Sequence, residues 1–262
     1  MIAPPKNSEW AKAYYTTGGS FWSGEENAES GRKRAQTIAR LAGPDRRAVL
    51  EIQSGHGGAA LATAQAGYDV TALDFAPIQS ENARRLVNQA APGRLTVVAE
   101  DQHTVDLGQR FDVVACWDGF GIGDDEDNLR LLHRIANDWL APGGIAILDI
   151  FCPLPWAAAH GRDQTLDRNH STHAYRQNRR MWFDPITAVA QDEWCPLSDE
   201  DGRRLEDLRI TQFIRCYFPA DFVRLASSAG LQTSLMEIDG APLSSDRLRE
   251  AWHYLVVLER GK

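Results

Sequence analysis

Two acidic residues and a run of glycines have the types and spacing of a nucleoside-binding site. Glu51 lies near the end of one apolar stretch, and Gly55 and Gly57 follow it. Asp74 ends the next apolar stretch. A strand that runs into a glycine-rich turn and a helix brings bare backbone close to a ligand and directs helix N–H groups at it. Asp74 then lies where it can accept hydrogen bonds from a ribose diol. In the purely structural alternative, the glycines only make a tight turn and Asp74 only caps the next helix.

The charge at this turn separates two classes of ligand. The spacing Gly55-x-Gly57-x-x-Ala60 matches the relaxed dinucleotide fingerprint. Glu51, however, places a carboxylate at the end of the strand, where it faces a cation far better than a pyrophosphate. S-adenosyl-L-methionine has a positive α-amino group and no phosphate. The charge therefore favours S-adenosyl-L-methionine as the cofactor.

Alternating apolar and helical stretches must position these residues. The apolar stretches are rich in Val, Ile and Leu, as is typical of strands buried on both faces. Strands that alternate with helices at this pitch predict parallel β-α-β units, so the fold class is α/β. In such a sheet the ligand lies beyond the carboxyl ends of the strands. Strands are predicted at 48–52, 69–74, 95–99, 111–117 and 145–151, and helices at 57–66, 77–90 and 127–140.

Two segments depart from this alternation. Residues 1–24 are rich in aromatic and small residues and predict an irregular arm, which a helix at 25–41 follows. The chain turns polar between residues 153 and 209, where a hairpin and then a third antiparallel strand are predicted, and we interpret residues 153–214 as an inserted substrate-binding lid. The alternation returns with a helix at 219–229 and strands at 231–238 and 253–259. The expected organisation is an arm over the site at 1–44, a cofactor-binding core at 45–152 and 215–262, and the lid at 153–214.

The motifs and their order resemble those of class I S-adenosylmethionine-dependent methyltransferases that act on small molecules. The resemblance covers roughly residues 46–152 and 215–260. It implies a Rossmann-like, mostly parallel seven-stranded sheet with an N-terminal helical arm and an antiparallel β lid. The matching stretches are Val49-Leu50-Glu51 with Gly55-His56-Gly57, Asp74, Glu100-Asp101-Gln102, Phe111-Asp112-Val113-Val114, Leu140-Ala141-Pro142-Gly143-Gly144, Phe218-Pro219-Ala220-Asp221-Phe222 and Ala229-Gly230-Leu231.

The resemblance also implies a role for each matching residue. Glu51 and the backbone at Gly55 and Gly57 would hold the methionine end of the cofactor. The remaining positions would surround the adenosine. Asp74 would bind the ribose, and Phe75 would pack on adenine. Asp101 would accept a hydrogen bond from the adenine amino group, with Gln102 beside the ring. Trp117 would flank the cofactor, and Asp118 would lie in the same cleft.

One position departs from the family pattern. The family usually has glycine where this chain has Gln53. Its side chain restricts how closely the backbone can approach the cofactor. Gln53 is tolerated if its φ is negative, with the side chain turned away or bonding the cofactor. Otherwise it marks a weakened or repurposed cofactor site.

Candidate catalytic side chains are less well specified. Methyl transfer is an in-line displacement that depends mainly on alignment and exclusion of water, and it needs a base only if the acceptor arrives protonated. His160 and His173 of the lid and Tyr14 of the arm are the candidates, although a structural role is the simpler interpretation of each histidine. His170 and His173 lack further ligands at a suitable spacing, so we predict no metal site.

Composition narrows the class of protein further. The chain has 262 residues, a net charge of -8, 43% hydrophobic and 24% charged residues, without a long apolar run or a basic signal-like start. The acidic balance argues against nucleic-acid and membrane partners. Four widely spaced cysteines argue against disulfides and zinc, and predict a cytoplasmic setting. A small-molecule methyl acceptor under a lid is the expected partner, in specialised metabolism, and the antiparallel insert also allows a homodimer.

Two alternatives stay open from the sequence. One is a nicotinamide-dependent oxidoreductase, which the fingerprint at Gly55 and Gly57 permits. The other, which Gln53 suggests, is a methyltransferase-like fold that binds S-adenosylmethionine without transferring its methyl group.

Overall fold

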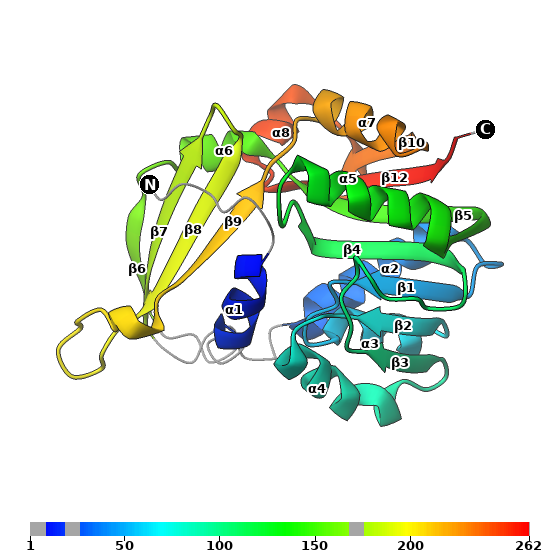
Figure 1. Ribbon diagram of the computed structural model, residues 1–262, viewed down its shortest axis with the longest axis horizontal. Coiled ribbons are helices and arrows are strands. Elements are labelled where there is room, and N and C mark those ends of the chain that lie inside the picture. Colours follow the sequence, from blue (N-terminus) through cyan, green and yellow to red (C-terminus); the bar gives the residue numbers. More distant parts are fainter. Residues whose placement is uncertain (1–8, 19–26, 168–175, 262) are drawn as a thin grey trace.

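The computed structural model describes residues 9–18, 27–167 and 176–261. It contains two sheets (Figure 1). The larger sheet has the strand order β11-β10-β12-β5-β4-β1-β2-β3, and the smaller sheet has the order β6-β7-β8-β9. The smaller sheet stands beside the larger one, and helix α1 lies in the space between them (Figure 1).

The larger sheet confirms the predicted α/β class. Its parallel part consists of β1 (Ala48–Ile52), β2 (Asp69–Leu73), β3 (Arg94–Val98), β4 (Phe111–Phe120) and β5 (Leu140–Phe151). Strand β12 (His253–Arg260) runs antiparallel to both β5 and β10 (Leu231–Ile238). The two-residue strand β11 (Ala241–Pro242) extends the expected seven strands by one.

Helices cover both faces of this sheet because every central strand is apolar on both sides. Apolar residues of α2 (Asn27–Ala42) and α3 (Gly58–Gln65) pack on one face. Those of α5 (Asp125–Arg134), its π-helical continuation (Ile135–Trp139) and α7 (Pro219–Ser228) pack on the other. The remaining helices are α4 (Pro77–Leu86) beside β3, α6 (Pro153–Ala158), α8 (Ser245–Glu250) and short 3-10 turns at Val87–Gln89 and Glu206–Leu208.

The strand order fixes where a ligand can lie. The chain builds outward from β1 through β2 to β3, then crosses back to place β4 on the other side of β1. The loops after β1 and β4 therefore leave the sheet in opposite directions and open a crevice at the carboxyl ends of these strands.

The smaller sheet presents an apolar face to the core. It consists of β6 (Asp163–Leu166), β7 (Gln177–Asp184), β8 (Val189–Pro196) and β9 (Ile210–Arg215), all paired antiparallel. Met181, Ala190 and Ile214 on this face pack against Phe151 and Trp156. This packing fixes the sheet over the crevice rather than leaving it as a separate body.

The N-terminal segment differs from the irregular arm expected for residues 1–24. Glu9–Gly18 form a helix, α1. Trp10 and Tyr14 lie one helical turn apart, and Trp10 packs edge-on against Phe213 of β9, with ring centroids 5.5 Å apart. This contact with a strand 200 residues away stabilises the helix, which the local sequence alone did not predict.

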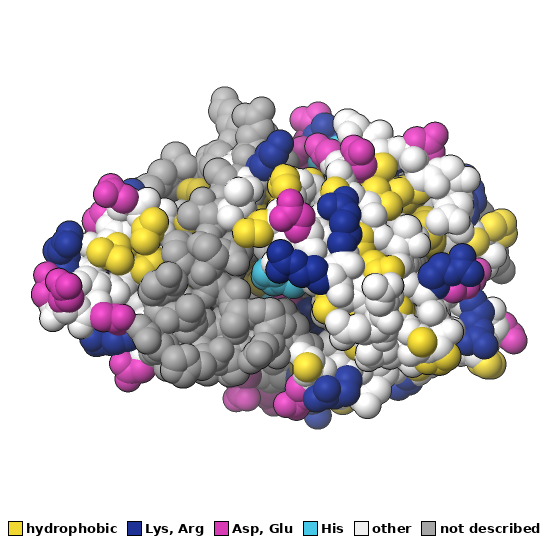
Figure 2. Space-filling model, turned by 90° about the horizontal axis from the view of Figure 1, so that it is seen from below, with side chains coloured by type: hydrophobic (Ala, Val, Ile, Leu, Met, Phe, Trp, Pro, Cys, Tyr) yellow, Lys and Arg dark blue, Asp and Glu magenta, His cyan; other side chains and the backbone are white. Residues whose placement is uncertain are grey.

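Among the described residues on the face drawn in Figure 2, acidic and basic side chains are interspersed. Within the described ranges, no helix is long and apolar enough to cross a membrane. All four cysteines are buried and free.

Candidate functional site

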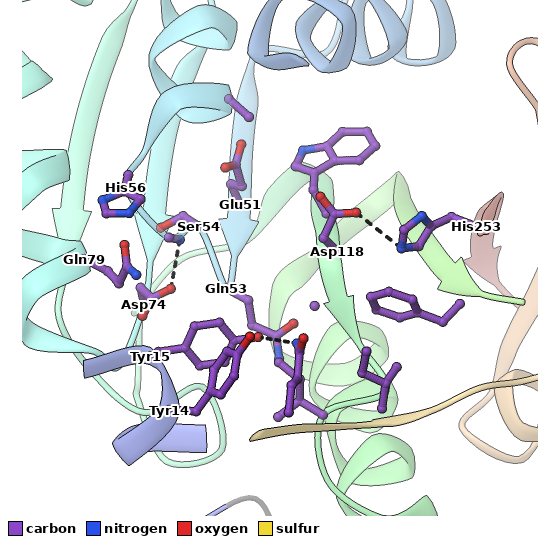
Figure 3. Close-up of a pocket in the computed structure, with 18 of the residues that line it drawn as sticks. Tyr14, Tyr15, Glu51, Gln53, Ser54, His56, Asp74, Gln79, Asp118 and His253 are labelled. Carbon is purple, nitrogen blue, oxygen red and sulfur yellow. Dashed lines mark hydrogen bonds and ion pairs between the residues drawn. The ribbon is translucent and has the colours of Figure 1, made fainter. Parts of the chain in front are cut away.

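A cavity of about 490 Å³ lies at the carboxyl ends of β1, β2 and β4 (Figure 3). Helices α1 and α2, the ends of β5 and β12, and the inner face of the smaller sheet complete its walls. The volume falls within the range of small-molecule sites. Of the residues predicted from the sequence, Tyr14, Glu51, Gln53, Gly55, Asp74, Phe75, Trp117 and Asp118 line this cavity.

Asp74 supports the glycine turn from the end of β2. Its Oδ2 accepts a hydrogen bond from the Gly55 amide at 2.9 Å, and its Oδ1 accepts one from the Ala76 amide at 2.8 Å. Burial raises the pKa of Asp74, and these two hydrogen bonds oppose that rise. Each oxygen keeps a second lone pair, which is the acceptor that a ribose hydroxyl needs.

Glu51 is almost fully buried at the end of β1, and its Oε2 has no hydrogen-bond partner. Burial raises the pKa of Glu51 to about 7, although the nearby Arg34 guanidinium opposes the rise. An unpartnered buried carboxylate oxygen is costly in the absence of a ligand, and an ammonium group would satisfy it.

Arg34, on helix α2, is a site residue that the sequence did not reveal. Its guanidinium pairs with the carboxylate of Asp118 and lies 5.7 Å from the centre of the Trp117 ring. It faces the same cavity as Glu51. The cavity therefore offers an anion and a cation side by side, which suits both charged groups of an α-amino acid.

Gln53 adopts a left-handed backbone with φ +55°, so the negative φ under which the sequence would tolerate this side chain is not what the structure has. Its side chain points into the cavity rather than away from it, and its Oε1 accepts a hydrogen bond from the Cys116 thiol at 3.1 Å. A Cβ on Gly119 would overlap this carboxamide, so the glycine provides the room for it. The chain thus accommodates a side chain at the family's glycine position through changes on the neighbouring strand β4.

Several predicted positions do not line this cavity. Gly57 has φ +79°, and a Cβ there would lie 2.8 Å from Cβ of Ala83, so it allows close packing of α3 on α4. Asp101 is exposed, and its Oδ1 accepts a hydrogen bond from the His103 amide. Gln102 is buried next to it, outside the cavity.

Of the three predicted catalytic residues, the two that the structure describes do not lie together. Tyr14 lies on the cavity wall (Figure 3). His160 is exposed away from the cavity, where its Nδ1 lies within hydrogen-bond distance of both backbone groups of Phe183. His173 lies outside the described residues, as do His170, Phe21 and Trp22 of the predicted lid and arm.

The smaller sheet contributes a polar group to the opposite wall. Arg179 on β7 forms two hydrogen bonds of 2.8 and 2.9 Å with the buried carboxylate of Asp192 on β8. Gln212 on β9 donates a hydrogen bond of 3.0 Å to the hydroxyl of Tyr15. Aromatic rings of Phe151, Trp156 and Trp252 adjoin these groups in the cavity wall. This wall therefore combines aromatic faces with fixed donors and acceptors.

His253 begins β12 and also faces the cavity, with its Nε2 3.4 Å from Oδ1 of Asp118 (Figure 3). Burial lowers the pKa of His253, although the Asp118 carboxylate opposes this effect. The sequence placed a strand at 253–259 without its direction. Because β12 runs antiparallel to β5, its first residue lies at the same edge as the last residues of the parallel strands.

Other lining residues were also missed, among them Ser54, His56 and Gln79. Ser54 and His56 lie inside the glycine motif, so their position in the sequence was itself a signal. For Arg34 no comparable signal exists, since α2 has several basic residues and only its packing decides which one faces the sheet. Across the three described stretches, no group of three His, Cys, Asp or Glu residues is placed to hold a metal ion.

The fold and the site together define a class of protein. Seven strands in this order, with a glycine turn after the first and an acid after the second, form the class I S-adenosylmethionine-dependent methyltransferase architecture. Residues 49–144 match the family model described as a methyltransferase domain. Residues 49–144 therefore form a methyltransferase domain, and the sheet around it has the Rossmann-like methyltransferase fold.

Solved structures with the same fold extend over nearly the whole chain. The CcbJ methyltransferase from Streptomyces caelestis is 21% identical, with a TM-score of 0.75 over 89% of this chain and 90% of its own. The sugar N-methyltransferase KedS8 from Streptoalloteichus sp. is 19% identical, with a TM-score of 0.65 over 100% and 97%. CalS10, an amino pentose methyltransferase from Micromonospora echinaspora solved with S-adenosylmethionine bound, is 20% identical, with a TM-score of 0.63 over 90% and 92%. A search of curated proteins gave no match.

Proposed function

We propose that this methyltransferase transfers the methyl group of S-adenosylmethionine to an amine of a small, polar, ring-containing acceptor such as an amino sugar. The observation that supports the cofactor half of this proposal is that Glu51 and Arg34 line the same cavity beside the glycine turn. The names of the sugar N-methyltransferase KedS8 and the amino pentose methyltransferase CalS10 support the acceptor half.

The residues of the cavity fit the cofactor group by group. The unpartnered Oε2 of Glu51 would accept a hydrogen bond from the α-ammonium, and Arg34 would bind the α-carboxylate. Asp74 would bind the ribose hydroxyls, and Phe75 would pack on adenine. The bound cofactor supplies an activated methyl group on a sulfonium centre.

The chain's own contribution to the reaction is alignment and exclusion of water. Gln53, Tyr14 and Tyr15 lie between the cofactor half of the cavity and the wall formed by the smaller sheet (Figure 3). Reactants held in line at contact distance can gain roughly 7–11 kcal/mol over reactants that meet in solution. Helix α1 and the smaller sheet close over this position, which keeps water from the reacting atoms.

The acceptor wall suits a polar ring. The faces of Trp156, Trp252 and Phe151 provide packing surfaces for the ring, and the Arg179–Asp192 pair and Gln212 provide hydrogen bonds to its substituents. A buried ion pair contributes little to stability by itself but gives fixed directions for recognition. We therefore assign acceptor recognition to this wall.

The proposal includes a cytoplasmic setting and a homodimer. Four cysteines that are free and buried support a reducing environment. Among the described strands, β6 lies at an edge of the smaller sheet, which is a position where a second copy can associate. Light scattering during size-exclusion chromatography measures the mass, and a monomer of 29.1 kDa would contradict the dimer.

Two measurements test the function. Calorimetric titration with S-adenosylhomocysteine should show binding, whereas NADH should not bind. Incubation with S-adenosylmethionine and a panel of amino sugars should release S-adenosylhomocysteine and give a product heavier by one methylene. Binding without transfer to any amine would contradict the proposed acceptor class, and binding of NADH alone would contradict the cofactor.

A further inference from the structure

Asp118 links the cofactor side of the cavity to the acceptor side. Its Oδ2 pairs with the guanidinium of Arg34, and its Oδ1 lies 3.4 Å from Nε2 of His253. The first contact is both an ion pair and a hydrogen bond, whereas the second is longer than the usual 2.7–2.9 Å of a charge-assisted hydrogen bond. In this arrangement Arg34 holds the carboxylate, and His253 is held only loosely.

The backbone presents Asp118 to the cavity by a local irregularity. Strand β4 loses its regular pairing with β5 between Cys116 and Phe120. Asp118 adopts φ +53° at this point, a left-handed conformation that is uncommon for non-glycine residues, although aspartate adopts it more often than most. Its side chain is half exposed to the cavity. Strained backbone of this kind persists where the position of the side chain matters.

Arg34 has room to change its partner. A second cavity of about 710 Å³ lies between α2 and the β10–β12 edge of the sheet. Arg34, Trp117, Trp252 and His253 line both cavities, so these residues form the wall between them. The Arg34 side chain therefore borders open space on both sides of this wall, and it is 22% exposed.

The charges around His253 come from three elements. Asp118 on β4 raises its pKa, and Arg34 on α2 lowers it. Asp149 on β5 lies near the same two groups, and burial and the Asp118 carboxylate raise its own pKa. The ring of Phe151 packs 4.2 Å from the imidazole centroid and adds no charge. Burial lowers the pKa of His253 most, and on top of it Asp118 and Arg34 act on the imidazole in opposite directions.

We propose that the α-carboxylate of the cofactor binds Arg34 in place of Asp118, and that Asp118 is thereby free to bind His253. This inference rests on the proposed binding mode of the cofactor. Asp118 then acts as a positioning residue, which fixes and charges His253 on the acceptor side only when the cofactor is in place. We call the arrangement of Arg34, Asp118 and His253 the bridge. Through it, the acceptor site is fully formed only after the cofactor has bound.

The test uses the imidazole signals of His253 and needs no acceptor. NMR titration of the histidines, with His253 assigned by its loss in H253Q, gives its pKa in the ligand-free protein and with two ligands. The ligands are S-adenosylhomocysteine and 5′-deoxy-5′-methylthioadenosine, which keeps the nucleoside but lacks the amino-acid part. We expect S-adenosylhomocysteine to raise the pKa of His253 by about one unit, a tenfold gain in proton affinity. The nucleoside alone should not raise it.

The variant Asp118→Asn isolates the bridge. Asparagine tolerates positive φ as well as aspartate does, so the variant should keep the fold. When S-adenosylhomocysteine binds to this variant, the pKa of His253 should rise by less than half as much as in the wild type. The variant keeps the effect of neutralising the Arg34 charge but lacks the carboxylate that would bind the imidazole. The signal of His160, which lies outside the cavity, is the internal control and should not move.

The outcomes separate this inference from the proposed function. A full rise in Asp118→Asn, a rise with the nucleoside alone, or no rise in the wild type with bound S-adenosylhomocysteine would each overturn the bridge while leaving the cofactor assignment intact. A failure of calorimetry to detect S-adenosylhomocysteine binding would overturn both.

Discussion

At the scale of single residues, Gln53 and Gly119 share one space. The carboxamide of Gln53 lies where a Cβ of residue 119 would stand, and the Cys116 thiol holds its oxygen. Neither residue can change size without affecting the other. The unusual φ of Gln53 is therefore maintained by contacts from the neighbouring strand.

This coupling predicts the result of a double-mutant cycle. Gly119→Ala should lower the free energy of unfolding by about 1–3 kcal/mol, since its methyl group overpacks the site. In a Gln53→Gly background the same change should cost less than half as much, because the carboxamide is gone. Urea unfolding measures all four proteins, and equal costs in the two backgrounds would show that the residues do not interact.

Asp74 carries a second prediction at this scale. Asp74→Ala should weaken binding of S-adenosylhomocysteine at least tenfold, about 1.4 kcal/mol, because the ribose hydroxyls lose their acceptor. Ser80→Ala is the matched control, since the Ser80 hydroxyl donates only to the backbone carbonyl of Asp74. Calorimetry should give Ser80→Ala a dissociation constant for S-adenosylhomocysteine within threefold of the wild-type value. An unchanged affinity of Asp74→Ala would mean that the ribose lies elsewhere.

At the scale of elements, helix α1 closes the cavity through a small number of contacts. Tyr15 lies edge-on to Phe75, with ring centroids 6.4 Å apart, and its hydroxyl accepts the hydrogen bond from Gln212. One residue thus joins the helix to the loop after β2 and to strand β9. The stability of this cover should control how fast the cofactor leaves.

Tyr15→Phe tests this role of the helix. The change removes the hydroxyl and keeps the ring, so it deletes one hydrogen bond of about 1 kcal/mol. The dissociation rate of S-adenosylhomocysteine should rise about fivefold, as measured by stopped-flow fluorescence. Tyr68→Phe, on a buried residue outside the cavity, is the control. If both variants release the ligand at the wild-type rate, α1 does not limit its exit.

At the scale of the whole molecule, stability and cofactor binding respond to pH in opposite ways through Glu51. Its pKa is about 7 in the folded protein against 4.5 for a free glutamate, so the folded state binds the proton more tightly. Stability is therefore highest below pH 4.5 as far as this group is concerned, and it falls as pH rises to 7, by about 3 kcal/mol. The cofactor ammonium needs the ionised form, so affinity should rise over the same range.

The variant Glu51→Gln separates these two effects. At pH 8 it should unfold at a higher denaturant concentration than wild type, and at pH 5 the difference should shrink. Calorimetry at pH 6 in buffers of different ionisation enthalpy should show that wild type releases more protons on binding S-adenosylhomocysteine than the variant does. Equal proton release would show that the ammonium does not meet Glu51.

Much of the cofactor half of the cavity could be predicted from the amino-acid sequence alone. The short apolar strands, the turn at Gly55 and the acids Glu51 and Asp74 are local features, and parallel strands necessarily bring their carboxyl ends to one edge. The acceptor half does not follow in this way. Arg179, Asp192 and Gln212 stand on three strands whose inner face could not be identified before their register was known.

The amino-acid sequence by itself determined the α/β alternation and the position of the nucleoside site, because hydrophobic period, glycine turns and strand ends are properties of neighbouring residues. Only the tertiary structure decided which side of α2 presents Arg34, that β12 runs backwards to deliver His253, and that Gln53 turns its side chain into the cavity. These depend on contacts between residues more than 60 positions apart, and such contacts form only when the sheets and helices pack.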